Sequence, residues 1–135
     1  MTVLQRAALY FTAAALGGLA VVLTVWAFGQ IGIADLFGVA IKPELAKGLI
    51  YKQMVWGGIW GLIFLLPIPI RPLWLKGLVM TLAPVAVALT VLLPGAGRGF
   101  LGKELGALTP VYIYLVNIPW GLVTAYLGRE LKADR

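Results

Sequence analysis

The side chains of this chain that could do chemistry are few, and carboxylates are the first of them. Only five residues of 135 are acidic. Two acids stand beside a lysine, in the segments Lys42-Pro43-Glu44 and Lys103-Glu104. A hydrated pair of carboxylates could form an acidic site at a pore mouth or on a partner surface. Two acids in the first turns of helices would instead only complement the helix dipoles.

Amide side chains are the second candidate chemistry. Asn117 is the only asparagine, and it stands two residues before Pro119. Proline in a helix frees the carbonyl four residues earlier, here that of Leu115, and bends the helix. Asn117 could bond a neighbouring helix at this kink, or it could line a polar site in a cavity. Gln53 poses the same two alternatives in another apolar stretch.

The chain lacks the residue types on which most catalytic mechanisms depend. The chain has no cysteine, no histidine and no serine. Thiolate and imidazole metal sites and the usual Ser, Cys or His nucleophiles are therefore absent. We predict a protein that is not an enzyme and that has no metal site and no cofactor.

The composition shows which elements must position these few polar groups. Hydrophobic residues make up 61% of the chain and charged residues 12%, with a mean hydropathy of +0.98. Soluble domains are about half apolar and about a quarter charged. The sequence therefore predicts an all-α integral membrane protein, a bundle of four transmembrane helices. The expected spans are residues 7–28, 49–66 (beginning as early as Pro43), 73–93 and 110–127.

Basic residues predict the orientation of the four spans. An even number of spans places both termini on one side, and the basic residues of that side lie close to the helix ends. We therefore predict a bacterial inner-membrane protein with both termini in the cytoplasm. The net charge of +6 then serves anionic lipid headgroups rather than nucleic acid. The residues expected to contact headgroups are Arg71, Lys76, Arg129 and Lys132.

Small residues at helical spacing predict close contacts between the spans. Gly57 and Gly61 are four residues apart, as in the Gly-x-x-x-Gly pattern that lets helix backbones approach. Gly17 and Gly18 in the first span and Gly121 in the fourth are the other expected packing positions. The contacts could lie within the chain or join it to membrane partners.

We predict an internal repeat that divides the single membrane domain, residues 1–135, into two similar halves, although chance similarity is the alternative in a chain this rich in Leu, Gly and Ala. At an offset of 60, Glu44-Leu45 matches Glu104-Leu105, and Trp60-Gly61-Leu62 matches Trp120-Gly121-Leu122. Each half, residues 7–66 and 73–127, would form one helical hairpin. Two spans return the chain to its starting side, so the hairpins would be parallel repeats.

Two functions fit these features. The first is a non-catalytic structural or accessory subunit, packed in a homo-oligomer or a larger membrane complex and surrounded by membrane lipids. The alternative is a small oligomeric channel or transporter with an outer acidic pair. The low polar content of the spans favours the first, because transport paths need polar linings.

Overall fold

The structure is a computed structural model, and it describes residues 1–134. These residues form helices and no strand, as the sequence predicts. Four helical stretches are long and apolar enough to cross a membrane: Val3–Gln30, Lys47–Leu65, Leu73–Gly95 and Thr109–Glu130. Each overlaps one of the expected spans, so the prediction of four apolar helices is confirmed.

Two of the four stretches are single α-helices, and two change their winding along their length. Helix α1 is Val3–Gln30 and helix α6 is Thr109–Glu130. Helix α3, Lys47–Trp60, continues as the 3₁₀ helix η1, Gly61–Leu65. Helix α4, Leu73–Val87, continues through the π-helix η2, Ala88–Leu92, into α5, Leu93–Gly95. The links hold α2, Ile33–Leu36, and the 3₁₀ helix η3, Phe100–Leu105.

The helix starts follow local hydrogen bonding more closely than composition. Helix α1 begins earlier than expected because Thr2 and Gln5 form a capping box, with hydrogen bonds of 3.1 and 2.8 Å. The expected early start of the second span at Pro43 is wrong. The backbone is still extended at Ala46, and α3 begins at Lys47.

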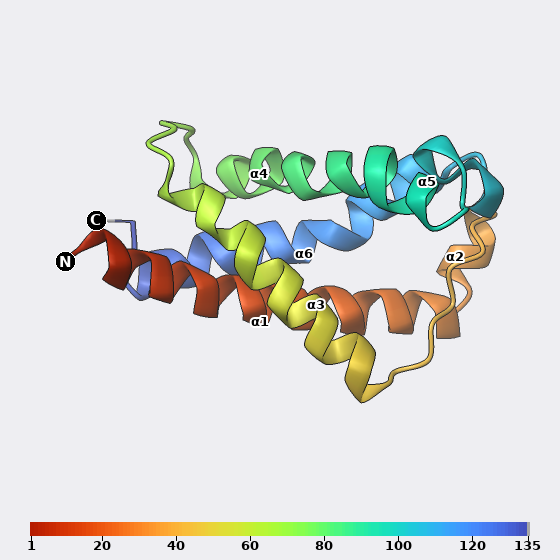
Figure 1. Cartoon of the computed structure of the whole chain (residues 1–135), viewed down its shortest axis with the longest axis horizontal. Helices are drawn as coiled ribbons and strands as arrows, with labels where there is room; N and C mark the ends of the chain where they lie inside the picture. Colours follow the sequence, from red (N-terminus) through yellow and green to blue (C-terminus); the bar gives the residue numbers. More distant parts are fainter. Residues whose placement is uncertain (135) are drawn as a thin grey trace.

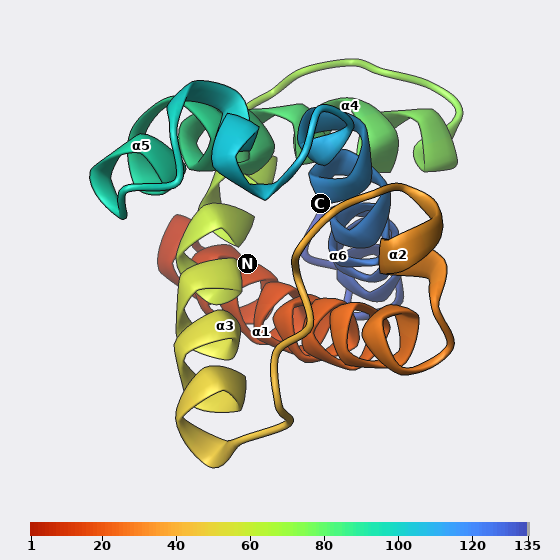
Figure 2. The same ribbon diagram turned by 90° about the vertical axis from the view of Figure 1, so that its right-hand side faces the viewer.

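The helices pack in the order α3, α1, α6, α4. Helices α1 and α6 run side by side along the long axis, and α3 crosses α1 obliquely (Figure 1). Both termini lie at one end, here called the terminal end, together with the turn of residues 67–72 (Figure 1). The longer links, residues 31–46 and 96–108, lie at the opposite end, here called the link end. Helix α3 approaches α4 near the terminal end and diverges from it toward the link end (Figure 2).

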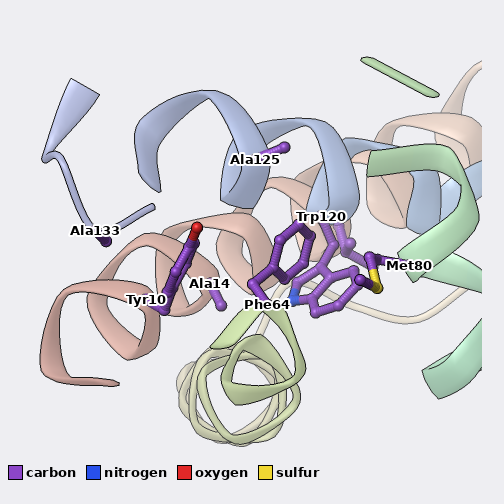
Figure 3. Close-up of a cluster of buried hydrophobic side chains, with 8 residues drawn as sticks. Tyr10, Ala14, Phe64, Met80, Trp120, Ala125 and Ala133 are labelled. Carbon is purple, nitrogen blue, oxygen red and sulfur yellow. The ribbon is translucent and has the colours of Figure 1, made fainter. Parts of the chain in front are cut away.

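The half of the bundle near the terminal end has a closed aromatic core. The Phe64 ring lies between Tyr10 and Trp120, with centroid distances of 5.6 and 5.9 Å. Met80 and Ala14 complete the cluster from α4 and α1 (Figure 3). The buried Trp120 indole donates a 3.1 Å hydrogen bond to the backbone carbonyl of a glycine in α3. This core fills the space between the helices around Phe64, and two cavities at the terminal end border it on its outer side.

Glycines set the distance between neighbouring helices. A Cβ at Gly57 would lie 2.9 Å from the carbonyl oxygen of Ala14, and one at Gly61 would collide with the Ala14 side chain. A Cβ at Gly121 would collide with the Gly77 carbonyl of α4. Since no side chain separates the backbones at these points, α1–α3 and α4–α6 are held in direct contact.

The two long links are joined at the link end. The amide of Ala40 donates a 2.9 Å hydrogen bond to the carbonyl of Leu105. A smaller cluster beneath them buries Ala34, Val39, Tyr112 and Val116. The links therefore tie the segment that follows α1 to the segment that precedes α6.

Candidate functional site

The two acids that the sequence singled out line none of the cavities described below. Glu44 lies in the irregular segment before α3, and Glu104 lies in η3, and both are exposed. Within residues 1–134 neither carboxylate has a hydrogen-bond or ion-pair partner. Neither lies in the first turn of α3 or α6, so the expected helix-dipole role is wrong for both. Lys42 pairs instead with Asp35, at 2.6 Å.

The amides, in contrast, share a cavity among the four long helices. This central cavity has a volume of about 310 Å³. Gln53 lines it from α3 and Asn117 from α6. Most of the wall is apolar and comes from α1, α3, the α4–η2 stretch and α6, with Val21, Val22, Val25, Leu49, Trp56, Ala88, Leu92, Ile113 and Val116 among its residues. The volume lies at the lower end of the 300–1,000 Å³ range of small-molecule sites.

The two amides keep hydrogen-bonding capacity for the cavity. The Asn117 side-chain nitrogen donates a 2.7 Å hydrogen bond to the carbonyl of Ile113, in its own helix. The expected bond from Asn117 to a neighbouring helix is therefore wrong, and its carbonyl oxygen stays available. The Gln53 side chain has no hydrogen-bond partner in the described part of the chain. An uncharged guest with donors and acceptors is the chemistry that this lining suits.

Helix winding changes where α4 borders the central cavity. Pro84 lines the cavity and has no N–H for the preceding helical turn. The π-helical turn η2 begins four residues later, and its Ala88 and Leu92 also line the cavity. Single π-helical turns occur frequently at functional sites. The sequence could not predict η2, because no residue pattern distinguishes a π-turn from an ordinary helix.

A second opening, the side groove, adjoins the central cavity. Its volume is about 710 Å³, and it lies between α3 and the η2–α5 stretch. Gln53, Trp56 and Leu92 line both spaces. The other lining residues are Tyr51, Lys52, Val55, Ile59, Leu93 and Ala96. The divergence of α3 from α4 thus opens the central cavity sideways.

Two hydrogen bonds between helices come from Tyr114 and Trp120, for which the sequence predicted no such role. The Tyr114 hydroxyl donates a 2.7 Å hydrogen bond to the Leu78 carbonyl and so joins α6 to α4. The Trp120 indole joins α6 to Gly57 of α3. Tyrosine and tryptophan usually find a partner when buried, but the sequence does not show which backbone carbonyl is near.

The glycines proposed for packing all lie at contacts between helices of this chain. A Cβ at Gly17 would lie 3.0 Å from the carbonyl oxygen of Trp120, and one at Gly18 would collide with that of Gln53. Gly57 and Gly61 face α1, and Gly121 faces α4. These glycines are thus used inside the chain.

The basic residues proposed for headgroups do not all lie together. Arg71, Lys76 and Arg129 line a single cavity of about 410 Å³ at the terminal end. Lys132 is exposed and does not line it. The cavity lies between the start of α4 and the end of α6.

Comparisons of the chain with protein-family models, with curated proteins and with solved structures give no match.

Proposed function

We propose that the chain is an integral protein of a bacterial inner membrane, with both termini in the cytoplasm. Its spanning stretches hold 19 to 28 residues, and about 20 apolar residues suffice to cross a bilayer. The basic residues Arg6, Arg71, Lys76 and Arg129 lie near the terminal end, which supports the cytoplasmic side for that end.

Within that membrane, we propose a non-catalytic subunit that packs against a transmembrane helix of another chain. The side groove carries this proposal. It is mostly apolar, it opens sideways, and it lies where α3 diverges from the α4–η2 stretch. Tyr51, Val55 and Ile59 are exposed along α3 at intervals of four residues, so they form one face of that helix. Val91 is exposed on η2. A partner helix lying along this face would restore the helix neighbour that α3 lacks.

A channel or transporter remains the alternative, and the central cavity is the observation that favours it. Gln53 and Asn117 supply polar groups, and Pro84 and η2 supply an irregular helix. Against it, the Tyr10–Phe64–Trp120 core closes the other half of the bundle. A pore through a single chain would have to pass this core. A pore formed between several copies of the chain would need polar residues on the outer faces of the helices.

The repeat also stays a prediction. Its support is that α1 packs on α3 and α4 packs on α6, so each half forms a hairpin. The matched tryptophans differ, however, in their surroundings. Trp120 is 3% exposed in the core, whereas Trp60 is only partly buried and its ring packs edge-on against Trp56.

Photo-crosslinking from the groove tests the subunit proposal. A photoreactive amino acid would replace Val55 or Ile59 in the native membrane, and the matched control would replace Leu16, exposed on α1 away from the groove. We expect protein adducts from the groove positions and only lipid adducts from Leu16.

Native mass spectrometry would then identify the partner in the adducts. A foreign subunit would support the accessory role, and a second copy would support a homo-oligomer. Lipid adducts alone at all three positions would overturn the proposal. Ion flux through the purified chain, lost when Asn117 is replaced by leucine, would also overturn it and establish the alternative.

A further inference from the structure

Four basic side chains gather at the terminal end of the bundle around two adjoining cavities. Arg71, Lys76 and Arg129 line the cavity of about 410 Å³. Arg6 and Lys76 line the other, of about 350 Å³. The two cavities share Lys76, and Asp134 is the only acid that lines either. These residues are called the basic site below.

The positive charge of the basic site is largely uncompensated. Within residues 1–134 the single ion pair is that of Lys42 with Asp35, which belongs to the link end. Arg6 donates its Nε to a backbone carbonyl, at 2.7 Å, and so keeps its terminal nitrogens available. The Arg129 guanidinium lies 5.0 Å from the centre of the Tyr126 ring, and Lys76 lies 6.0 Å from that of Phe64. These contacts orient the cations without neutralising them.

The backbone around the basic site is held in place before any ligand arrives. The Arg6 bond is made to Ala133, which is fully buried and whose own amide bonds the Gly128 carbonyl at 2.9 Å. The C-terminal segment is thereby fixed to α1. Arg71 lies within the turn of residues 67–72, in which three of six residues are prolines, and it directly precedes Pro72, which restricts its backbone. A prearranged set of donors loses less entropy on binding an anion.

The walls of the basic site add apolar surface to the charge. Phe64, Ile68, Pro69 and Leu73 line the larger cavity beside the cations. A soluble anion would gain nothing from these side chains, whereas a phospholipid presents phosphate and the start of its acyl chains together. Basic pockets between transmembrane helices on the cytoplasmic side bind headgroups of this kind.

We infer that the basic site binds the headgroup of a phospholipid that carries two phosphates. Four cations facing one carboxylate leave enough positive charge for two phosphates, one more than phosphatidylglycerol carries. Guanidinium groups bind phosphate in a bidentate manner, so Arg71 and Arg129 would hold one phosphate and Arg6 with Lys76 the other. The inference uses the proposed function only in placing the chain in a membrane, and it does not depend on a partner in the side groove.

Lipid competition in nanodiscs tests this inference on the full chain. The bilayer would be phosphatidylcholine with equal amounts of diphosphatidylglycerol and phosphatidylglycerol, and native mass spectrometry would count the lipids retained by the protein. We expect preferential retention of diphosphatidylglycerol. Replacing Arg71 or Lys76 by glutamine should each weaken that retention by about fivefold, the effect of one cation at a membrane surface.

Matched variants distinguish lipid binding at the basic site from a general effect of positive charge. Lys103→Gln removes an exposed cation at the link end and should leave lipid retention unchanged. Arg71→Lys keeps the charge but loses the bidentate geometry, so it should lie between wild type and Arg71→Gln. Circular dichroism would verify that each variant keeps its helices.

Three results would overturn the inference. They are equal retention of both anionic lipids, an equal loss in Lys103→Gln, and full displacement of lipid by inorganic pyrophosphate, which would assign the site to a soluble anion. The crosslinking at Val55 would be unaffected by each of them, so the two proposals fail separately.

Discussion

Adding a methyl group at Gly61 should separate α3 from α1. Gly61 begins the 3₁₀ stretch that follows α3, and it is buried. A Cβ there would lie 2.8 Å from the Tyr10 carbonyl oxygen and would collide with the Ala14 side chain. Both obstacles belong to the backbone of α1 or to a side chain with no rotamer to change. The helices must therefore move apart for Gly61→Ala to fold.

The size of the effect follows from the distances. Moving the Tyr10 carbonyl oxygen from 2.8 Å to an ordinary contact of about 3.4 Å needs a shift of about 0.6 Å, and relieving the collision with the Ala14 side chain needs more. A gap of about 0.5–1 Å already forfeits about a quarter to a half of a contact's attraction. The neighbouring close contact at Gly57 would open as well. We expect a loss of about 1–3 kcal/mol in the free energy of unfolding, the usual cost of overpacking, and a larger loss for Gly61→Leu.

The assay is reversible unfolding in mixed micelles, with Gly48→Ala as the matched control. Gly48 also lies in α3, but a Cβ there would meet nothing within 4 Å. Since alanine is the better helix former by about 1 kcal/mol, this control should be neutral or more stable than wild type. Wild-type stability of Gly61→Ala, or an equal loss in Gly48→Ala, would refute glycine-mediated contact as the determinant of α1–α3 packing.

Two further pairs of variants test the buried polar groups. Tyr112→Phe should maintain or raise stability, because the buried Tyr112 hydroxyl has no hydrogen-bond partner within residues 1–134. Tyr114→Phe should lower stability by about 0.6–2 kcal/mol through loss of the bond to α4. Equal changes of the two variants in the same unfolding assay would contradict this reasoning. Trp120→Phe should cost at least as much as Tyr114→Phe, because it removes the indole bond to Gly57 and leaves space in the core. Trp74→Phe is the control, since Trp74 is 50% exposed, and an equal loss there would argue against the core role of Trp120.

Composition and prolines were enough to predict the helices, because both act within one segment. Twenty apolar residues satisfy their backbone only as a helix in lipid, and the prolines of residues 67–72 end a helix wherever they stand. The boundary that failed, at Pro43, depended on tertiary context. Ala40 just before it is held by the Leu105 carbonyl, a bond between segments 65 residues apart.

The candidate site was harder to predict, because it depends on which faces of the helices meet. Gln53 and Asn117 were visible as polar residues in apolar stretches, yet nothing in the sequence placed them in one cavity. Glu44 and Glu104 stood in matching sequence contexts, but their segments adopt different backbones, one irregular and one 3₁₀. Two residues with similar sequence neighbours need not lie close together in space when the links around them differ in length.

The distribution of glycines explains why the bundle is closed in one half and open in the other. Backbone contacts through glycine join α1 to α3, α1 to α6 and α4 to α6, so three of the possible helix pairs are fixed at short distance. No glycine on α3 faces α4, and bulky residues, Trp56 on α3 and Leu92 on η2, stand at that gap instead. Near the terminal end the Phe64 ring packs between Tyr10 and Trp120, whereas toward the link end Trp56 and Leu92 only line the opening. The side groove therefore follows from the positions of the small residues. Val55→Trp would fill the groove without disturbing a glycine contact. It should block the binding of a partner and leave the free energy of unfolding of the chain unchanged.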